Sequence, residues 1–176
     1  MRRITWRPNI TNMPGRAFLW TKAQGIRDLG TLGGPGSVAY AISNSAQVVG
    51  QADVEGFGHA FLWTESGGMQ DLGTLGGGHS GAFAINNKGE VVGYSDTGIK
   101  FNHAFLWTKA TGMQDLYALG FIGLVSGIND NSRIVGSAIA ADPLFSPTSC
   151  LSCLSNRVKV EESFPERRSA ARAWSV

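Results

Sequence analysis

Short apolar runs alternate along this chain with clusters of glycine, asparagine and serine. The run at residues 59–64, HAFLWT, is aromatic and too short for an ordinary helix, so it predicts a buried strand. Three more strands are predicted after it, at residues 69–75, 81–85 and 90–95. These units show no helical periodicity. The pattern therefore predicts an all-β fold.

Turn-forming residues separate the predicted strands. Residues 65–68, ESGG, and 86–89, NNKG, are rich in glycine and asparagine, which tolerate the left-handed backbone of tight hairpins. Residues 76–80, GGGHS, predict a flexible connection between the second and third strands. Four strands in about 43 residues is the length and content of one β-propeller blade.

The same unit is written three times. AFLWT begins at Ala17, Ala60 and Ala104, DLGTL or its variant DLYAL begins at Asp28, Asp71 and Asp115, and the unit closes at Gly50, Gly93 and Gly136. Successive copies lie 43 or 44 residues apart. We therefore divide the chain into a lead-in (1–15), three repeats (16–58, 59–102 and 103–136) and a tail (137–176). Repeats of this kind bury their faces by stacking on neighbours.

Three such repeats predict an open, propeller-like array, because closed propellers usually have about four to eight blades. A β-trefoil, with three copies of a four-stranded unit, is the alternative. Aromatic residues two positions apart share one face of a strand, and they predict the core between repeats. These pairs are Phe18 and Trp20, Phe61 and Trp63, and Phe105 and Trp107.

The tail differs from the repeats in composition. All 24 glycines lie between Gly15 and Gly136, whereas both cysteines, Cys150 and Cys153, lie in the tail. A second pair of zinc ligands at suitable spacing does not accompany them, so we interpret them as incidental. The tail is predicted to be a degenerate cap, or an irregular or disordered segment that no longer encodes the repeat, as after a truncation or frameshift, and we favour the second. The abrupt start of the first repeat also predicts a piece cut from a longer array.

Composition excludes several classes of protein. Of 176 residues, 43% are apolar and 16% are charged, which is typical of a globular chain. The net charge of +2 is too small for a nucleic-acid surface. The sequence shows no run of about 20 apolar residues that would span a membrane. The N-terminal arginines precede no apolar run, so no signal peptide is visible.

Two polar positions recur in the repeats and are candidates for a metal or ligand site. One is an aspartate, at Asp28, Asp71 and Asp115. The other is a histidine in two copies and an arginine in the first, at His59, His103 and Arg16. We expect the aspartates to accept hydrogen bonds from turn amides. Because the arginine breaks a ring of histidine ligands, we expect a structural hydrogen bond at the second position.

The remaining candidates concern glycine and serine. The glycine loops at residues 33–37 and 76–80 lack the Gly-Lys-Ser/Thr of a phosphate-binding loop and lead into predicted strands. Ser37 and Ser80 recur, but a neighbouring histidine, His79, accompanies only one of them. This arrangement does not predict a Ser-His-Asp triad. We therefore assign no catalytic, cofactor-binding or metal residue, and expect no enzyme activity and no cofactor.

The unit HAFLWT, GGMQDLGTLGG and AFAINNKGEVVGYS closely resembles the HAF family of extracellular repeat proteins, named after His-Ala-Phe. Motif, order and period agree over residues 16–136. The resemblance implies a bacterial all-β repeat module at the cell surface or outside the cell, of unknown biochemical role and without catalytic residues. Arg16 departs from the family pattern, and the tail lies outside the match.

These observations predict a non-enzymatic β-repeat scaffold or binding module that acts in surface or extracellular interactions. The expected partner is a protein or a glycan, not a nucleic acid, and the open blade edges predict self-association. The alternatives are an accessory fragment of a secreted enzyme and a truncated remnant of a longer repeat protein.

Overall fold

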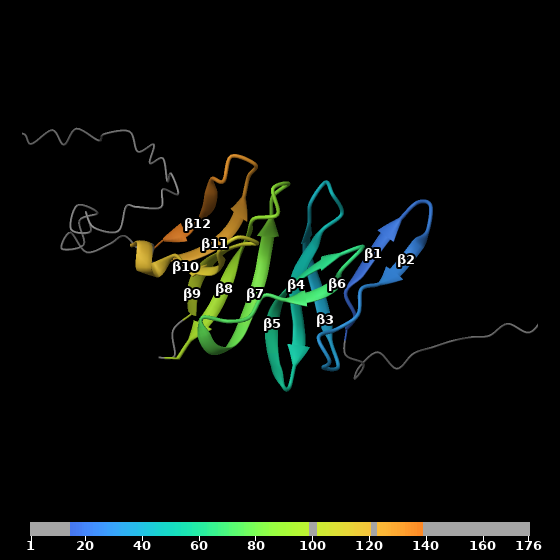
Figure 1. Ribbon diagram of the computed structural model, residues 1–176, viewed down its shortest axis with the longest axis horizontal. Helices are drawn as coiled ribbons and strands as arrows, with labels where there is room; N and C mark the ends of the chain where they lie inside the picture. Colours follow the sequence, from blue (N-terminus) through green and yellow to red (C-terminus); the bar gives the residue numbers. More distant parts are fainter. Residues whose placement is uncertain (1–14, 99–101, 121–122, 139–176) are drawn as a thin grey trace, which may run out of the picture.

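The computed structural model describes residues 15–98, 102–120 and 123–138. Twelve strands, arranged in four antiparallel sheets, account for most of these residues (Figure 1). The cysteines and nearly all of the predicted lead-in and tail lie outside the described residues.

Two of the sheets have four strands and two have only two. The first complete sheet comprises β3 (Ser37–Ile42), β4 (Val48–Val54), β5 (Phe57–Thr64) and β6 (Gly68–Asp71), in that spatial order. The second comprises β7 (Gly76–Ile85), β8 (Val91–Thr97), β9 (Asn102–Thr108) and β10 (Gly112–Asp115). The two-stranded sheets are β1 (Phe18–Thr21) with β2 (Gly25–Asp28), and β11 (Gly123–Ile128) with β12 (Ile134–Ala138). A 3-10 helix, η1 (Tyr117–Leu119), follows β10.

The fold is all-β, as predicted. The sheets follow one another in a row, with the two-stranded sheets at its opposite ends (Figure 1). The described strands form no closed barrel, which the β-trefoil alternative would need. The described residues also contain no helix long and apolar enough to cross a membrane.

The sheets are out of phase with the sequence repeat. The repeat at 59–102 gives β5 and β6 to one sheet and β7 and β8 to the next. Each complete sheet therefore joins the last two strands of one repeat to the first two strands of the following repeat. The four strands predicted in each repeat are present, but they do not form one sheet.

Two of the predicted boundaries in the second repeat are wrong. Residues 76–80, predicted as a flexible connection, belong to β7, where Gly76 lies opposite Thr97 and Ser80 lies opposite Ser95. The strand predicted over residues 69–75 ends at Asp71, because the Asp71 side chain accepts the N–H of Gly73 and turns the chain. The two predicted hairpin turns, at residues 65–68 and 86–89, are confirmed.

Each sheet has two different apolar faces. Phe61 and Trp63 pack in one buried cluster with Leu29, beside β1 and β2. Phe105 and Trp107 pack in another, which holds Leu62 of the preceding sheet. The aromatic pairs of the two complete sheets therefore face the sheet before them, as expected for a core between repeats. The prediction is wrong for the first repeat in one chain, where Phe18 and Trp20 are exposed because no sheet precedes β1 and β2 in the described residues. The leucine between the two aromatic residues faces the sheet after it.

Equivalent turns are joined along the row by hydrogen bonds. The backbone N–H of Asn44 donates to Oδ1 of Asn87, and the N–H of Asn87 donates to Oδ1 of Asp130, each at 2.8 Å. The partners are 43 residues apart in both cases. The bonds from the Asn87 backbone and side chain, with the nearby Lys88 ammonium, hold the pKa of the Asp130 carboxyl below its usual range. This ladder ties three hairpins of the array together.

Candidate functional site

The recurring aspartate anchors the turn that follows the second strand of each repeat, which is β2, β6 or β10. One carboxylate oxygen accepts a backbone N–H two residues later, at 2.8, 2.7 and 2.9 Å for Asp28, Asp71 and Asp115. Such a bond mimics a backbone turn and fixes the chain as it leaves the strand. The predicted role as an acceptor of turn amides is therefore confirmed.

The second carboxylate oxygen pairs with the residue at the start of the neighbouring strand. Nδ1 of His59 lies 2.8 Å from Oδ2 of Asp71, and His103 and Asp115 form the same contact. In the first copy, a guanidinium nitrogen of Arg16 lies 3.1 Å from Oδ2 of Asp28. The arginine thus replaces the histidine in the same contact, which confirms the structural hydrogen bond predicted at this position.

These pairs leave little capacity to bind a cation. Both oxygens of each aspartate have partners within the protein. The N–H of Gly30 and then the Arg16 guanidinium hold the pKa of the Asp28 carboxyl below its usual range. Within the described ranges, no three histidine, cysteine, aspartate or glutamate side chains gather where they could share a metal ion.

The recurring serine is buried and engaged with the backbone. Ser80 Oγ donates to the carbonyl of Gly73 at 2.6 Å and accepts the N–H of Ala60 at 2.8 Å. Ser37 makes the equivalent bonds one repeat earlier. The neighbouring His79 accepts the N–H of Gly58 on its Nδ1, at 3.2 Å. The serine therefore holds the connection between sheets in place and is not presented to a substrate.

Ser80→Ala should lower the free energy of unfolding by about 1–3 kcal/mol, because it leaves the buried N–H of Ala60 and the carbonyl of Gly73 without this partner. Urea denaturation monitored by circular dichroism would measure the loss. Ser126→Ala is the matched control, since Ser126 is exposed and its hydroxyl bonds to one carbonyl at 3.3 Å. We expect the control to change stability by less than about 0.5 kcal/mol. Equal losses would contradict this role of Ser80.

An aromatic surface lies where the first strands of successive sheets meet. Strands β3, β7 and β11 are each at the edge of their own sheet, and β7 contacts both of the others. The rings of Tyr40 and Phe83 are 5.9 Å apart between centroids, and those of Phe83 and Tyr94 are 5.4 Å apart. The Tyr94 hydroxyl accepts a hydrogen bond from Gln51 at 2.9 Å, which fixes that ring. Tyr40 remains exposed.

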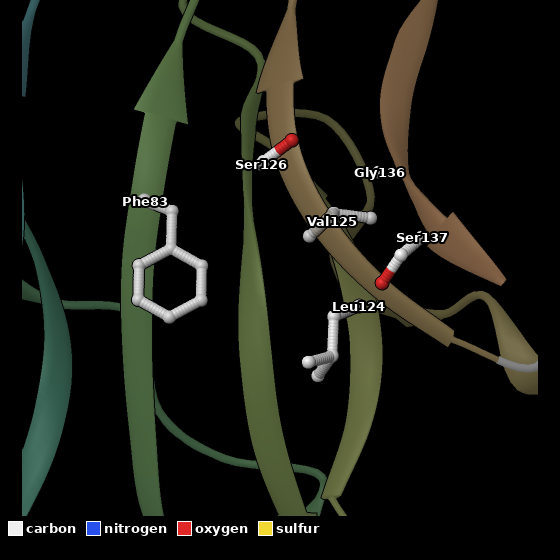
Figure 2. A pocket seen from close by; sticks show the side chains of 6 residues that line it. All are labelled: Phe83, Leu124, Val125, Ser126, Gly136 and Ser137. Carbon is white, nitrogen blue, oxygen red and sulfur yellow. The ribbon is translucent and has the colours of Figure 1, made fainter.

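An open groove of about 550 Å³ continues this surface toward the end of the row. Figure 2 shows Phe83 on β7 at one side and the side chains of β11 at the other. The lining is mainly apolar, with two serine hydroxyls, and consists of Phe83, Leu124, Val125, Ser126, Gly136 and Ser137. None of these side chains ionises near neutral pH, and the apolar lining gives the groove contact area with two hydroxyls for hydrogen bonding.

Sequence reasoning did not find this surface. Tyr40, Phe83 and Ser126 occupy the same position of three successive repeats, but only two of them are aromatic. The sequence does place an aromatic residue, Tyr40 or Phe83, in the third strand of the first two repeats. In the structure these strands are β3 and β7, which lie at the edges of their sheets and leave the rings partly exposed. No protein-family model matches the chain, and no curated protein is significantly similar to it.

Proposed function

We propose that the chain is a non-enzymatic β-repeat binding module, and that it binds its partner on the surface formed by Tyr40 of β3, Phe83 of β7 and the apolar groove between β7 and β11. One observation carries this proposal. The rings of Tyr40 and Phe83 lead into an apolar groove, whereas the recurring aspartates, histidines and serines of the described residues support the backbone. The polar groups that recur are thus occupied, and the surface left for recognition is aromatic.

The chemistry of the surface favours a glycan or an extended protein segment. Aromatic rings offer a large contact area at low cost in conformational entropy, and tyrosine adds a hydroxyl for hydrogen bonding. The hydroxyls of Ser126 and Ser137 border the apolar groove. A partner with alternating apolar and hydroxyl or amide groups suits such a surface. The resemblance to the HAF family supports a place at the cell surface or outside the cell, where glycans and exposed protein segments are available.

Tyr40→Ala and Phe83→Ala should each weaken binding at least tenfold, because contact aromatics commonly contribute more than about 1.4 kcal/mol to affinity. The full chain would be screened on glycan and peptide arrays, and the strongest ligand titrated by calorimetry. Tyr117→Ala is the control, because Tyr117 follows β10, at the opposite edge of its sheet.

An equal loss with the Tyr117 variant, or no saturable ligand on either array, would contradict the proposed surface. Release of product from an array glycan would instead support the accessory part of a secreted enzyme. A purified chain that is unfolded would support a remnant without a role of its own.

A further inference from the structure

The two-stranded sheets at the ends of the row are complementary halves of one complete sheet. In the complete sheets, the second strand pairs with the third, β4 with β5 and β8 with β9. By position in the repeat, β12 corresponds to β4 and β8, and β1 corresponds to β5 and β9. Within the described residues, β12 pairs with β11 alone and β1 pairs with β2 alone. Each end therefore presents the strand edge that the other end would pair with.

The exposed apolar side chains lie where these missing halves would pack. Trp20 is 60% exposed, whereas Trp63 at the same position of the next repeat is 3% exposed. Phe18 is 57% exposed against 0% for Phe61. At the other end, Val135 is 63% exposed, whereas its equivalents, Val49 and Val92, are both 0% exposed.

A third exposed position lies on β3, beside the first half sheet. Ile42 is 54% exposed, and its equivalent Ile85 is 8% exposed and packs in the cluster between the two complete sheets. Ile85 packs against β3 and β4, the first two strands of the sheet before it. Within the described residues, the half sheet before Ile42 has only β1 and β2 and lacks such a strand pair. The strand pair β11–β12 of another chain has the position in the repeat that would cover Ile42.

We propose that two copies of this chain assemble head to tail, with β12 of each copy pairing with β1 of the other, and close a ring of four-stranded sheets. The described residues of each chain supply two complete sheets and two halves, so those of two chains form six complete sheets. Six lies within the usual range of about four to eight for closed propellers, whereas a ring closed by one chain would have three. The half sheets also lie at opposite ends of the row in one chain (Figure 1).

The internal sheets specify the register of this junction. Val49 lies opposite Leu62, and Val92 lies opposite Leu106. The equivalent pair across the junction is Val135 of one copy with Leu19 of the other.

The turn ladder continues in the same way. Asn44 donates to Asn87, and Asn87 donates to Asp130. The N–H of Asp130 would therefore donate to the Asn44 side chain of the second copy. The same geometry buries Phe18, Trp20, Ile42 and Val135.

We assign a second copy of this chain as the partner of each half sheet. The half that each end lacks has the strand order, register and apolar positions that the chain itself carries at its other end. An unrelated partner would have to reproduce all three. The pairing goes beyond the binding role proposed above and does not depend on it, since a ring can form whether or not the aromatic surface has a ligand.

One chain has a mass of 18.7 kDa. Size-exclusion chromatography of the full chain with light-scattering detection should give twice this mass. Trp20→Glu and Val135→Glu should each give a monomer with an unchanged circular dichroism spectrum, because both side chains are exposed in one chain. A mixture of the two variants should recover some dimer, because one of its two junctions is intact. Phe57→Glu, at an exposed residue of the first complete sheet, should leave the dimer unchanged. A monomeric wild-type chain, or a dimer that Val135→Glu does not affect, would overturn the proposal.

Cysteine cross-linking tests the register and the closure. In a Cys150→Ser, Cys153→Ser background, Leu19→Cys with Val135→Cys should oxidise to a covalent dimer without larger species. Leu19→Cys with Leu124→Cys is the control, because those positions lie two strands apart across the junction, at least about 10 Å from each other, which is too far for a disulfide. A ladder of higher oligomers would show an open filament and overturn the ring. Equal cross-linking of the control pair would overturn the register.

Discussion

Trp63→Ala should lower the free energy of unfolding by about 3–5 kcal/mol, which is the range for removing a large aromatic side chain from a core. Trp63 is buried in the cluster between the first half sheet and the first complete sheet, with Val48, Phe61 and Leu29. The Arg27 guanidinium also lies 5.0 Å from the centre of its ring. The substitution removes both the packing and the cation–π contact. Equilibrium denaturation in urea would measure the loss.

Trp20→Ala is the matched control, because Trp20 occupies the same position of the preceding repeat and is exposed in one chain. Both substitutions are compared in the Val135→Glu background, which blocks the proposed pairing of chains, and there we expect Trp20→Ala to change stability by less than about 0.5 kcal/mol. Similar losses for the two variants would mean that burial between sheets does not distinguish these positions. A loss confined to Trp63→Ala would show that the tryptophan stabilises the array where it is buried between two sheets.

Strands and turns could be predicted from the sequence because their signals are local. The run of residues 59–64 lies within β5, and the glycine and asparagine of residues 86–89 form the turn between β7 and β8. The grouping of strands into sheets could not be predicted, because it depends on pairing across the boundary between repeats. The sequence holds one local indication of this pairing, a glycine at position 56 between two predicted strands. In the structure, Glu55 and Gly56 have φ of 47° and 90° and form the two-residue loop of a tight hairpin between β4 and β5.

The candidate site was predictable only where its residues recur. The aspartate and histidine positions appear in each repeat, and their contact with one another spans only 12 residues. The buried serine bonds instead to a carbonyl 7 residues before it and an N–H 20 residues before it, so its role needs the folded connection. The groove joins β7 to β11, and Phe83 and Ser126 on its two sides are different residue types at one repeat position. A search for recurring residues therefore could not find it.

Gly93 closes the second repeat at a point where two strands come unusually close. A β-carbon built at Gly93 would lie 1.9 Å from the carbonyl oxygen of Gly81 and 2.9 Å from the Cα of Ala82. The cause is a bulge in β7, where the register with β8 shifts between Ala82 and Ala84. A β-carbon built at Gly50 or Gly136, the glycines that close the other two repeats, would likewise lie 1.9 or 2.0 Å from a carbonyl oxygen. The glycine is thus required for space beside the backbone of the bulged strand.

Gly93→Ala should lower the free energy of unfolding by at least about 3 kcal/mol, since backbone atoms on two paired strands must separate to admit the methyl group. In the Val135→Glu background, which blocks the proposed pairing of chains, Gly136→Ala should cost less, because β12 is then an edge strand and can move outward. Gly98→Ala is the control, with its nearest atom at an ordinary 3.7 Å, and should change stability by less than about 1 kcal/mol. Urea denaturation of the three variants would rank them. Native-like stability of the Gly93 variant would mean that the bulge can relax around a side chain, and that the glycine closing each repeat does not fix the approach of the two strands.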